Sequence, residues 1–203
     1  CLGDYIYRIQ DRKRVSPSGA DLGLHGEVAS LSEFRAVVFH SLLRDDQGTQ
    51  YKLMSADVSN AYLHAKPPAS MPSHWFEVDE KIYDLLPEAL RNEVDRHGGP
   101  GQALIEMSRC LYGHPVAGHV WIQMCRAELT SKRMGWSPVP GTSSLFKKGN
   151  SLVAVYVDDI AAAGPESELN DLFEKLAQAF EFRDPACAMD EFLGIQVLRR
   201  DRA

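Results

Sequence analysis

The sequence predicts an α+β fold in which antiparallel strands are backed by helices. Residues 144–157 contain two β-prone runs separated by Gly149-Asn150, which is typical of a two-residue hairpin. Residues 160–164 then form the expected return strand of a second hairpin, whose turn is predicted to be Asp158-Asp159. Pro165 opens a helix with an apolar stripe at helical spacing, which indicates core packing. The stripe consists of Leu169, Leu172, Phe173, Leu176 and Phe180.

Other elements are predicted from local patterns. Residues 31–43 read as a helix, with Ser30 or Ser32 as its N-cap. Residues 85–94 are expected to form a short helix, and the glycine-rich segment 97–101 a turn. This turn is not a phosphate loop, because no Lys and Ser or Thr follow its glycines. Residues 102–107 are expected to return as a strand.

Composition bounds the class of protein. The 203 residues are 44% hydrophobic, which is enough to bury one large core or the cores of two small lobes. The sequence has no long apolar span and no visible signal peptide, so we expect an intracellular protein that is neither secreted nor membrane-bound. Its four cysteines show no Cys-x-x-Cys spacing, which favours reduced thiols. Because the chain opens with Cys1 and not Met, we expect an excerpt of a longer polyprotein.

Two adjacent acids, Asp158 and Asp159, close the apolar run 152–157. Neighbouring carboxylates after a buried strand repel each other unless a cation neutralises them. Mg²⁺ is the expected cation, because it takes hard oxygen ligands and often binds carboxylates together with substrate phosphates. A solvated turn is the alternative, since Asp is common in turns.

A third acid, Asp57, ends another β-prone stretch, residues 51–56. Two strands would then each place acidic residues at the same end of a sheet, Asp57 on one and Asp158 with Asp159 on the other. The long separation along the chain is no obstacle, because folding brings catalytic groups together. The sequence therefore predicts a metal site made by three carboxylates.

Four ordered motifs carry a resemblance to a known family. They are Asp57-Val58-Ser59-Asn60-Ala61-Tyr62-Leu63-His64-Ala65, Leu111-Tyr112-Gly113 with Trp121 beyond it, Tyr156-Val157-Asp158-Asp159, and Phe192-Leu193-Gly194-Ile195-Gln196-Val197. In this order they resemble the motifs of copia-type retrotransposon reverse transcriptases. The resemblance spans residues 30–200 and implies RNA-directed DNA synthesis on a right-hand polymerase palm, with partial fingers and no thumb. It implies one domain fragment over residues 1–203. In that fragment, 1–50 and about 66–110 are fingers-like, and about 51–65 and 111–203 are palm.

The resemblance also implies the metal ligands. Asp57 and Asp158 would hold two Mg²⁺ ions, the backbone carbonyl of Val58 would complete one coordination shell, and Asp159 would support them. Two metals clamp both the attacking and the leaving oxygen of an in-line displacement. The rate enhancement then comes mainly from positioning of the substrates and neutralisation of their negative charge.

Further roles follow from the same resemblance. Tyr62 would lie under the sugar of the incoming nucleotide and exclude a 2′-hydroxyl, with Ala61 and Gly113 also in the nucleotide site. Tyr156 and Tyr112 would support primer or template. The alternative for Tyr62 is a core aromatic on a helix face, and for Tyr156 it is ordinary strand packing.

The chain departs from the family at one motif. Copia-type sequences continue Leu-Tyr-Gly with Leu-Lys-Gln-Ser-Pro-Arg-Ala-Trp, whereas residues 114–121 read His-Pro-Val-Ala-Gly-His-Val-Trp. Contacts of the family's Lys, Gln and Arg are therefore not carried over. His114 and His119 are poor candidates for metal ligands, because no Cys or carboxylate partner stands at a metal-site spacing. The amino-terminal basic cluster could bind a triphosphate or be a solvated face (Arg8, Arg12, Lys13 and Arg14).

The implied partners are an RNA or DNA template with its primer, deoxynucleoside triphosphates, and the RNase H and integrase parts of a Pol polyprotein. The implied location is a cytoplasmic particle or the nucleus. The formal net charge of −6 opposes binding to the phosphate backbone of nucleic acid, so we expect weak, salt-sensitive template binding by this fragment. Two alternatives stay open: a catalytically silent remnant that at most binds nucleic acid, and an unrelated two-metal nuclease or phosphodiesterase.

Overall fold

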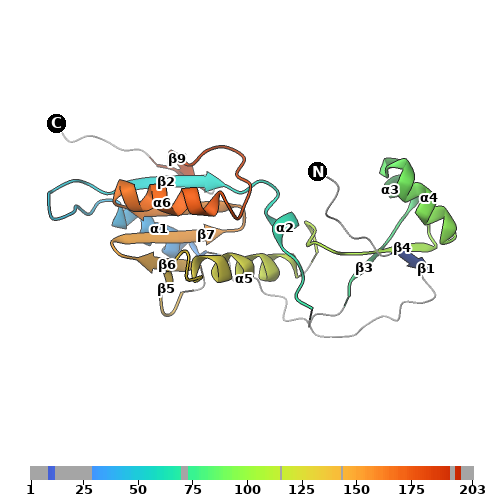
Figure 1. The fold of residues 1–203 in the computed structure, drawn as a ribbon. Helices are drawn as coiled ribbons and strands as arrows, with labels where there is room; N and C mark the ends of the chain where they lie inside the picture. The colour runs from blue at the N-terminus through green and yellow to red at the C-terminus, as the bar shows by residue number, and fades with distance from the viewer. Residues whose placement is uncertain are drawn as a thin grey trace.

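The protein, seen in a computed structural model, has two lobes joined through a short helix (Figure 1). The structure describes residues 9–11, 29–69, 73–114, 116–142, 144–192 and 195–197. The strands are β1 (Ile9–Asp11), β2 (Lys52–Asp57), β3 (Trp75–Glu77), β4 (Ala103–Glu106), β5 (Ser137–Pro138), β6 (Leu145–Lys148), β7 (Ser151–Tyr156), β8 (Asp159–Gly164), β9 (Cys187–Ala188), β10 (Glu191–Phe192) and β11 (Ile195–Gln196). The helices are α1 (Leu31–His40), α2 (Ala61–His64), α3 (Glu80–Leu85), α4 (Glu88–Arg96), α5 (Ala117–Leu129) and α6 (Glu166–Leu176).

The larger lobe is built on an antiparallel sheet with strand order β5-β6-β7-β8-β2-β9. Its centre is the pair of hairpins expected from the sequence, and Gly149, with a φ of 53°, forms the first turn with Asn150. Such a positive φ suits glycine at a tight two-residue turn. The arrangement of an antiparallel sheet with helices agrees with the predicted α+β class.

The second hairpin turns one residue earlier than predicted. Tyr156 pairs with Asp159, so Val157 and Asp158 form the turn and Asp159 is the first residue of β8. The shift has a clear cause, because Asp159 also pairs with Asp57 of β2 and is therefore held between two strands. The two acids do not share an exposed tip: both are half-buried, one in the turn and one in the sheet.

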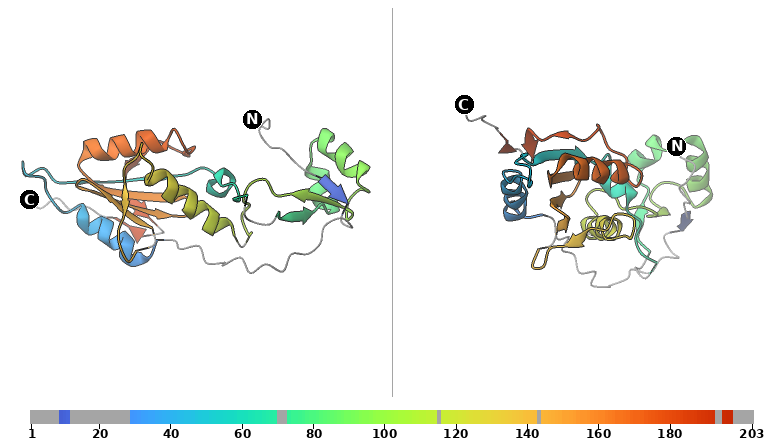
Figure 2. Two further views of the ribbon diagram at one scale, coloured as in Figure 1. Left: turned by 60° about the horizontal axis from the view of Figure 1, so that its bottom comes forward. Right: turned by 60° about the vertical axis from the view of Figure 1, so that its left-hand side comes forward.

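Successive side chains of each strand point to opposite sides of the sheet, and apolar side chains on both sides give it two apolar faces. One face packs under α5 and α6, where Trp121 and Leu172 are almost fully buried with Val153, Val155 and Ile160. The other face, made largely by alanines of β8, packs against α1 through Phe34 and Val37. Figure 2 shows the sheet between α6 and α1. Each large apolar side chain buried in this way contributes about 1.5–3 kcal/mol.

Helix α1 begins with a capping box. The Ser30 hydroxyl accepts a hydrogen bond from the Glu33 amide, and the Glu33 carboxylate accepts one from the Ser30 amide. The N-cap is therefore Ser30, one of the two predicted residues, and the helix ends at His40, before the predicted end. The sequence predicts that residues 1–50 group with 66–110, whereas α1 packs on β7 and β8 of the larger lobe. Its apolar side chains bury against the alanines of β8, which explains this placement.

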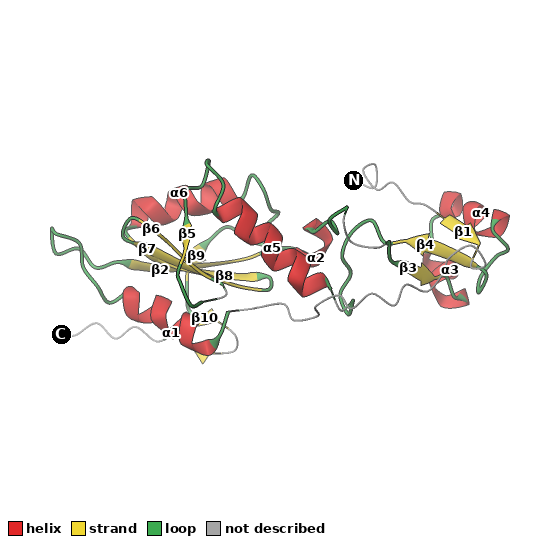
Figure 3. Cartoon of the chain, turned by 90° about the horizontal axis from the view of Figure 1, so that it is seen from below, coloured by secondary structure: helices red, strands yellow, loops and turns green. Residues whose placement is uncertain are grey.

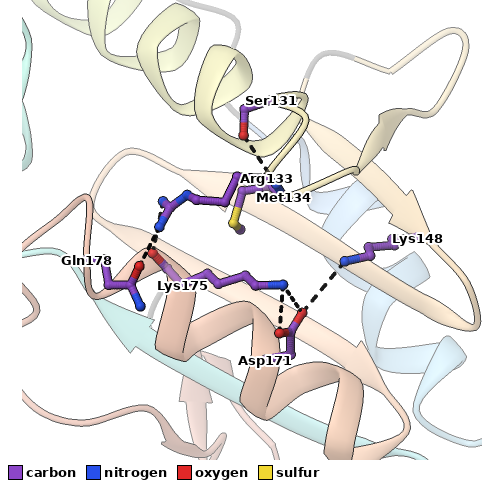
Figure 4. Close-up of polar contacts among 7 residues, drawn as sticks. All are labelled: Ser131, Arg133, Met134, Lys148, Asp171, Lys175 and Gln178. Carbon is purple, nitrogen blue, oxygen red and sulfur yellow. Dashed lines mark hydrogen bonds and ion pairs between the residues drawn. The ribbon is translucent and has the colours of Figure 1, made fainter.

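Helix α6 is held to its neighbours by polar contacts as well as by its apolar stripe (Figure 4). Arg133, just after α5, donates hydrogen bonds to the Gln178 side chain at 2.7 Å and to the Lys175 carbonyl at 3.2 Å. Asp171 accepts a hydrogen bond from Lys175 and lies 3.7 Å from the Lys148 ammonium. These contacts connect α6 to β6 and to the end of α5.

The smaller lobe has its own sheet, with order β1-β4-β3 and a small core that includes Val78, Val94 and Ile105. The predicted strand at 102–107 is present as β4. The single helix predicted at 85–94 is instead two helices, α3 and α4, because the backbone leaves the helical region at Leu86 before Pro87.

Helix α2 is a single turn at the junction of the two lobes (Figure 3). The chain passes from β2 through α2 into the smaller lobe and returns from β4 into α5. In the part of the chain that the structure describes, no helix has the length and apolar character to cross a lipid bilayer. The cysteines seen there, Cys110, Cys125 and Cys187, are free thiols.

Candidate active site

The structure brings the three predicted acids together at one end of the central sheet. Asp57 of β2 and Asp159 of β8 are direct partners across the antiparallel ladder. Side chains of directly opposed residues share a face of the sheet, so both carboxylates lie on the same side, as does Tyr156 of β7. Asp158 is fixed beside them, because its carbonyl accepts a hydrogen bond of 2.7 Å from the Val58 amide.

The turn that carries Asp158 is strained and anchored. Val157 has a φ of 48°, a region that β-branched residues rarely adopt. Its carbonyl accepts a hydrogen bond from the indole of Trp121, which is buried in α5. Through this contact α5 positions the turn that carries Asp158.

Burial and mutual repulsion perturb the carboxylates. Burial raises the pKa of Asp159 to about 6, and the charges of Asp158 and Asp57 contribute, while Arg183 acts in the opposite direction. Burial also raises the pKa of Asp57; Arg183 opposes this shift, and Asp158 and Asp184 add to it. A cluster of carboxylates with raised pKa values is typical of functional sites.

Sequence reasoning missed Arg183. Its guanidinium Nη1 lies 3.1 Å from Oδ2 of Asp57, and its amide donates a hydrogen bond of 2.9 Å to the Asp57 carbonyl. The segment after α6 runs antiparallel to the end of β2, with a bridge between Val58 and Phe182 and a bond from the Ser59 amide to the Glu181 carbonyl. A basic residue after a predicted helix was the sole signal in the sequence, and it does not reveal this pairing.

The donor set suits a hard divalent cation. Oδ1 of Asp57 is buried and accepts no hydrogen bond from any described residue, which leaves a carboxylate oxygen without compensation. Burial first, and the neighbouring carboxylates second, raise the pKa of Asp57 and of Asp159, so a cation bound here would favour their ionised forms. Over the described ranges, however, no three Asp, Glu, His or Cys side chains form a ready metal cage. The chemistry of the oxygens fits Mg²⁺, and the closed geometry is not formed.

The predicted nucleotide residues follow directly from the end of β2. Asn60 adopts the left-handed conformation, with φ 51° and ψ 47°, and turns the chain into α2. Ala61 is fully buried under the larger core, whereas Tyr62 is half-buried. The ring of Tyr62 lies 4.6 Å, centroid to centroid, from the ring of Tyr112, which is 54% exposed. Tyr62 and Tyr112 therefore form one aromatic surface beside the acids.

Gly113 continues this segment with a φ of 84° and open space where a Cβ would be. The next residue, His114, contacts His74 of the smaller lobe, with 2.8 Å between Nε2 and Nδ1. This pair connects the lobes, and neither His114 nor His119 belongs to a metal-binding group in the described segments. His119 lines a pocket of about 370 Å³ together with His64, Lys66 and Arg109. None of the predicted site residues lines this pocket.

Some predicted features lie outside the described residues. These are the basic cluster of Arg8, Arg12, Lys13 and Arg14, together with Pro115, Leu193 and Gly194. The strands β10 and β11 flank the last two as an antiparallel pair, with Phe192 opposite Ile195.

Comparison with known proteins decides the family. A family model described as reverse transcriptase (RNA-dependent DNA polymerase) matches residues 47–202, which is most of the chain. The chain belongs to this reverse transcriptase family. The match contains all three acids and the segments that position them.

The curated relatives place this reverse transcriptase domain among copia-type elements, as its motifs predicted. It is 25% identical over 132 residues to the transposon Ty1-BL Gag-Pol polyprotein of Saccharomyces cerevisiae, a match over 64% of this chain and 6% of that polyprotein. It is 27% identical over 110 residues to the truncated transposon Ty1-A Gag-Pol polyprotein of the same yeast, over 54% of this chain and 8% of the relative. The reverse transcriptase domain thus spans less than a tenth of these relatives. No solved structure is a significant match.

Proposed function

We propose that this domain is the RNA-directed DNA polymerase of a copia-type retrotransposon polyprotein and transfers nucleotides to a primer 3′-hydroxyl. The single observation that carries the proposal is the pairing of Asp57 with Asp159 beside the Val157-Asp158 turn, in a chain of this family. In this proposal residues 51–65 and 111–203, with α1 packed on their sheet, belong to the palm, and residues 66–110 belong to the fingers.

Asp57, Asp158 and the backbone carbonyl of Val58 would hold two Mg²⁺ ions, with Asp159 in support. The ions would activate the primer hydroxyl and stabilise the leaving pyrophosphate. The protein's own contribution is to hold the carboxylates close together at the ends of strands β2 and β8, where burial and mutual repulsion disfavour their charge until a cation binds.

The aromatic residues would orient the substrates. Tyr62 would contact the sugar of the incoming deoxynucleotide and exclude a 2′-hydroxyl, with Ala61 behind it and Gly113 close to the base. The burial of Ala61 and the contact between Tyr62 and Tyr112 support a fixed position for the Tyr62 ring. Tyr156 shares the face of Asp159, so it and the exposed Tyr112 would support the primer and template.

The partners proposed are a primed RNA or DNA template, deoxynucleoside triphosphates, and RNase H and integrase segments of the same polyprotein, in a cytoplasmic particle or the nucleus. The names of the relatives as Gag-Pol polyproteins support this context. The net charge of −6 opposes binding to phosphates, so template affinity of the domain would be weak and would fall steeply with salt.

A catalytically silent copy is the second candidate. It is favoured by the segment 114–120, where the family's Lys, Gln and Arg are replaced, and by the absence of a ready metal cage in the described ranges. The intact set of three acids favours activity.

Primer extension tests the proposal. The protein is incubated with a primed RNA template, one deoxynucleotide and Mg²⁺, and the primer length is measured. Extension supports the polymerase, shortening indicates a nuclease, and no change indicates a silent remnant or an incomplete fragment. Asp158→Asn should abolish extension and leave the circular dichroism spectrum unchanged, because it removes ligand charge and not packing. Asp46→Asn, in an exposed turn before β2, is the matched control and should extend normally.

A further inference from the structure

Arg183 forms an ion pair with Asp57, one of the carboxylates that the proposed polymerase needs as metal ligands. Its guanidinium lies 3.1 Å from Oδ2 of Asp57, and its charge opposes the rise that burial causes in the pKa of Asp57 and of Asp159. Positive charge at this position therefore acts on two of the three carboxylates. A divalent cation held by Asp57 would compete for the same carboxylate.

The backbone of Arg183 is fixed and its side chain is free to move. The Arg183 amide donates to the Asp57 carbonyl at 2.9 Å, and the neighbouring bridge between Val58 and Phe182 holds the segment against β2. The side chain is 64% exposed, compared with 30% for that of Asp57. The guanidinium can consequently leave the carboxylate for solvent without any change in the main chain.

The two oxygens of Asp57 differ in a way that fits this exchange. Oδ2 is neutralised by Arg183, whereas Oδ1 is buried without a hydrogen bond from the described residues. While the guanidinium pairs with Oδ2, that oxygen is not available to a cation. Displacing the guanidinium would free Oδ2, so that both oxygens of Asp57 could bind the ion.

We infer that Arg183 is a displaceable counter-ion of Asp57: it neutralises the carboxylate in the metal-free protein, and divalent cations bind in competition with it. The inference rests on the proposed function, because it assumes that the cation binds at Asp57. Arg183 acts through Asp57 and is a positioning residue. An exposed ion pair is weak, so the competition changes affinity modestly and reversibly.

The test measures metal binding directly, without nucleic acid. Mn²⁺ affinity is measured by electron paramagnetic resonance and Mg²⁺ affinity by calorimetry. Arg183→Gln should bind both ions about two- to fivefold more tightly, the range that corresponds to losing one exposed ion pair. Arg183→Lys keeps the charge and should stay closer to the unmodified protein. Arg96→Gln removes an exposed arginine that pairs with Glu93 in the smaller lobe, and it should leave both affinities unchanged.

Asp57→Asn separates failure of this inference from failure of the proposed function. If Asp57→Asn abolishes ion binding but Arg183→Gln binds equally or more weakly, the counter-ion role is overturned and the metal site stands. If Asp57→Asn leaves ion binding unchanged, the proposed metal site itself fails. Should Arg183→Gln not fold, a crystal structure of the unmodified protein with Mn²⁺ decides: the contact between Arg183 and Asp57 must be broken where the ion is bound, and an intact contact overturns the inference.

Discussion

The indole of Trp121 donates a hydrogen bond to the carbonyl of Val157, and so connects the core of α5 to the turn that carries Asp158. Trp121 is 1% exposed, whereas Val157 has a positive φ that a β-branched residue adopts at a cost. The turn is thus held in an unfavourable conformation by a rigid, buried donor. Rigid support of this kind is what a site for charged ligands needs.

Trp121→Phe should therefore damage the site more than the fold. The change leaves the Val157 carbonyl without its donor and should lower the free energy of unfolding by about 1–3 kcal/mol in urea denaturation. Because the turn can then relax, extension of a primed template should fall by about tenfold or more. Trp136→Phe is the control, since Trp136 is equally buried in the same core. An equal loss of extension in both variants would contradict the role of the indole.

Asn60 is expected to matter through its backbone. It adopts the left-handed conformation between β2 and α2 and its side chain is exposed. Asn60→Ala should lower the free energy of unfolding by about 1 kcal/mol, because alanine lacks the short polar side chain whose local hydrogen bonds let asparagine tolerate this conformation. Asn60→Gly should change it by no more than a few tenths, because glycine adopts positive φ readily. Chemical denaturation of the pair distinguishes the backbone effect from a side-chain effect, for which both variants would lose equally.

The central sheet could be predicted because its signals are local. Alternating apolar residues, Gly149-Asn150 and the stripe of α6 each determine structure over a few residues, and all three are present as expected. The convergence of Asp57 with Asp158 and Asp159 was also predictable, because Asp57 ends β2, Asp159 begins its partner strand β8, and Asp158 lies in the turn just before β8.

Features that depend on pairing between distant segments could not be predicted. The register that makes Asp159 a strand residue is set by Asp57 on one side and Tyr156 on the other. The ion pair between Arg183 and Asp57 arises where the segment after α6 meets β2. The position of α1 depends on the alanines of β8, which form an apolar surface that becomes visible only once the sheet is assembled.

Tyr62→Ala should relax the choice of sugar. If the ring lies under the incoming sugar, its loss should raise ribonucleotide incorporation relative to deoxynucleotide incorporation by about tenfold or more, the discrimination typical of a steric contact. Tyr62→Phe keeps the ring against Tyr112 and should retain the preference. Single-nucleotide extension with each substrate measures the ratio. An unchanged ratio in Tyr62→Ala would return Tyr62 to the role of a core aromatic.

Stability of the metal-free protein should depend on pH through Asp159. Its pKa is raised from 3.8 to about 6, so between these values the folded state binds more protons than the unfolded state. The stabilisation that the protonated Asp159 contributes is complete below the pKa of the unfolded state, 3.8, and is lost as the pH rises through the folded pKa of about 6. The free energy of unfolding attributable to Asp159 should consequently decrease over this interval.

Asp159→Asn isolates this contribution, because asparagine does not titrate. The difference in unfolding free energy between the variant and the unmodified protein, measured by urea denaturation in the presence of a chelator, should shift in favour of the variant as the pH rises from about 4 to about 6. Asp171→Asn is a control of opposite sign: the hydrogen bond from Lys175 and the charges of Lys175 and Lys148 lower the pKa of Asp171, so its stabilisation grows as the pH rises through its folded pKa. A difference for Asp159→Asn that does not vary with pH would contradict the electrostatic description of the site.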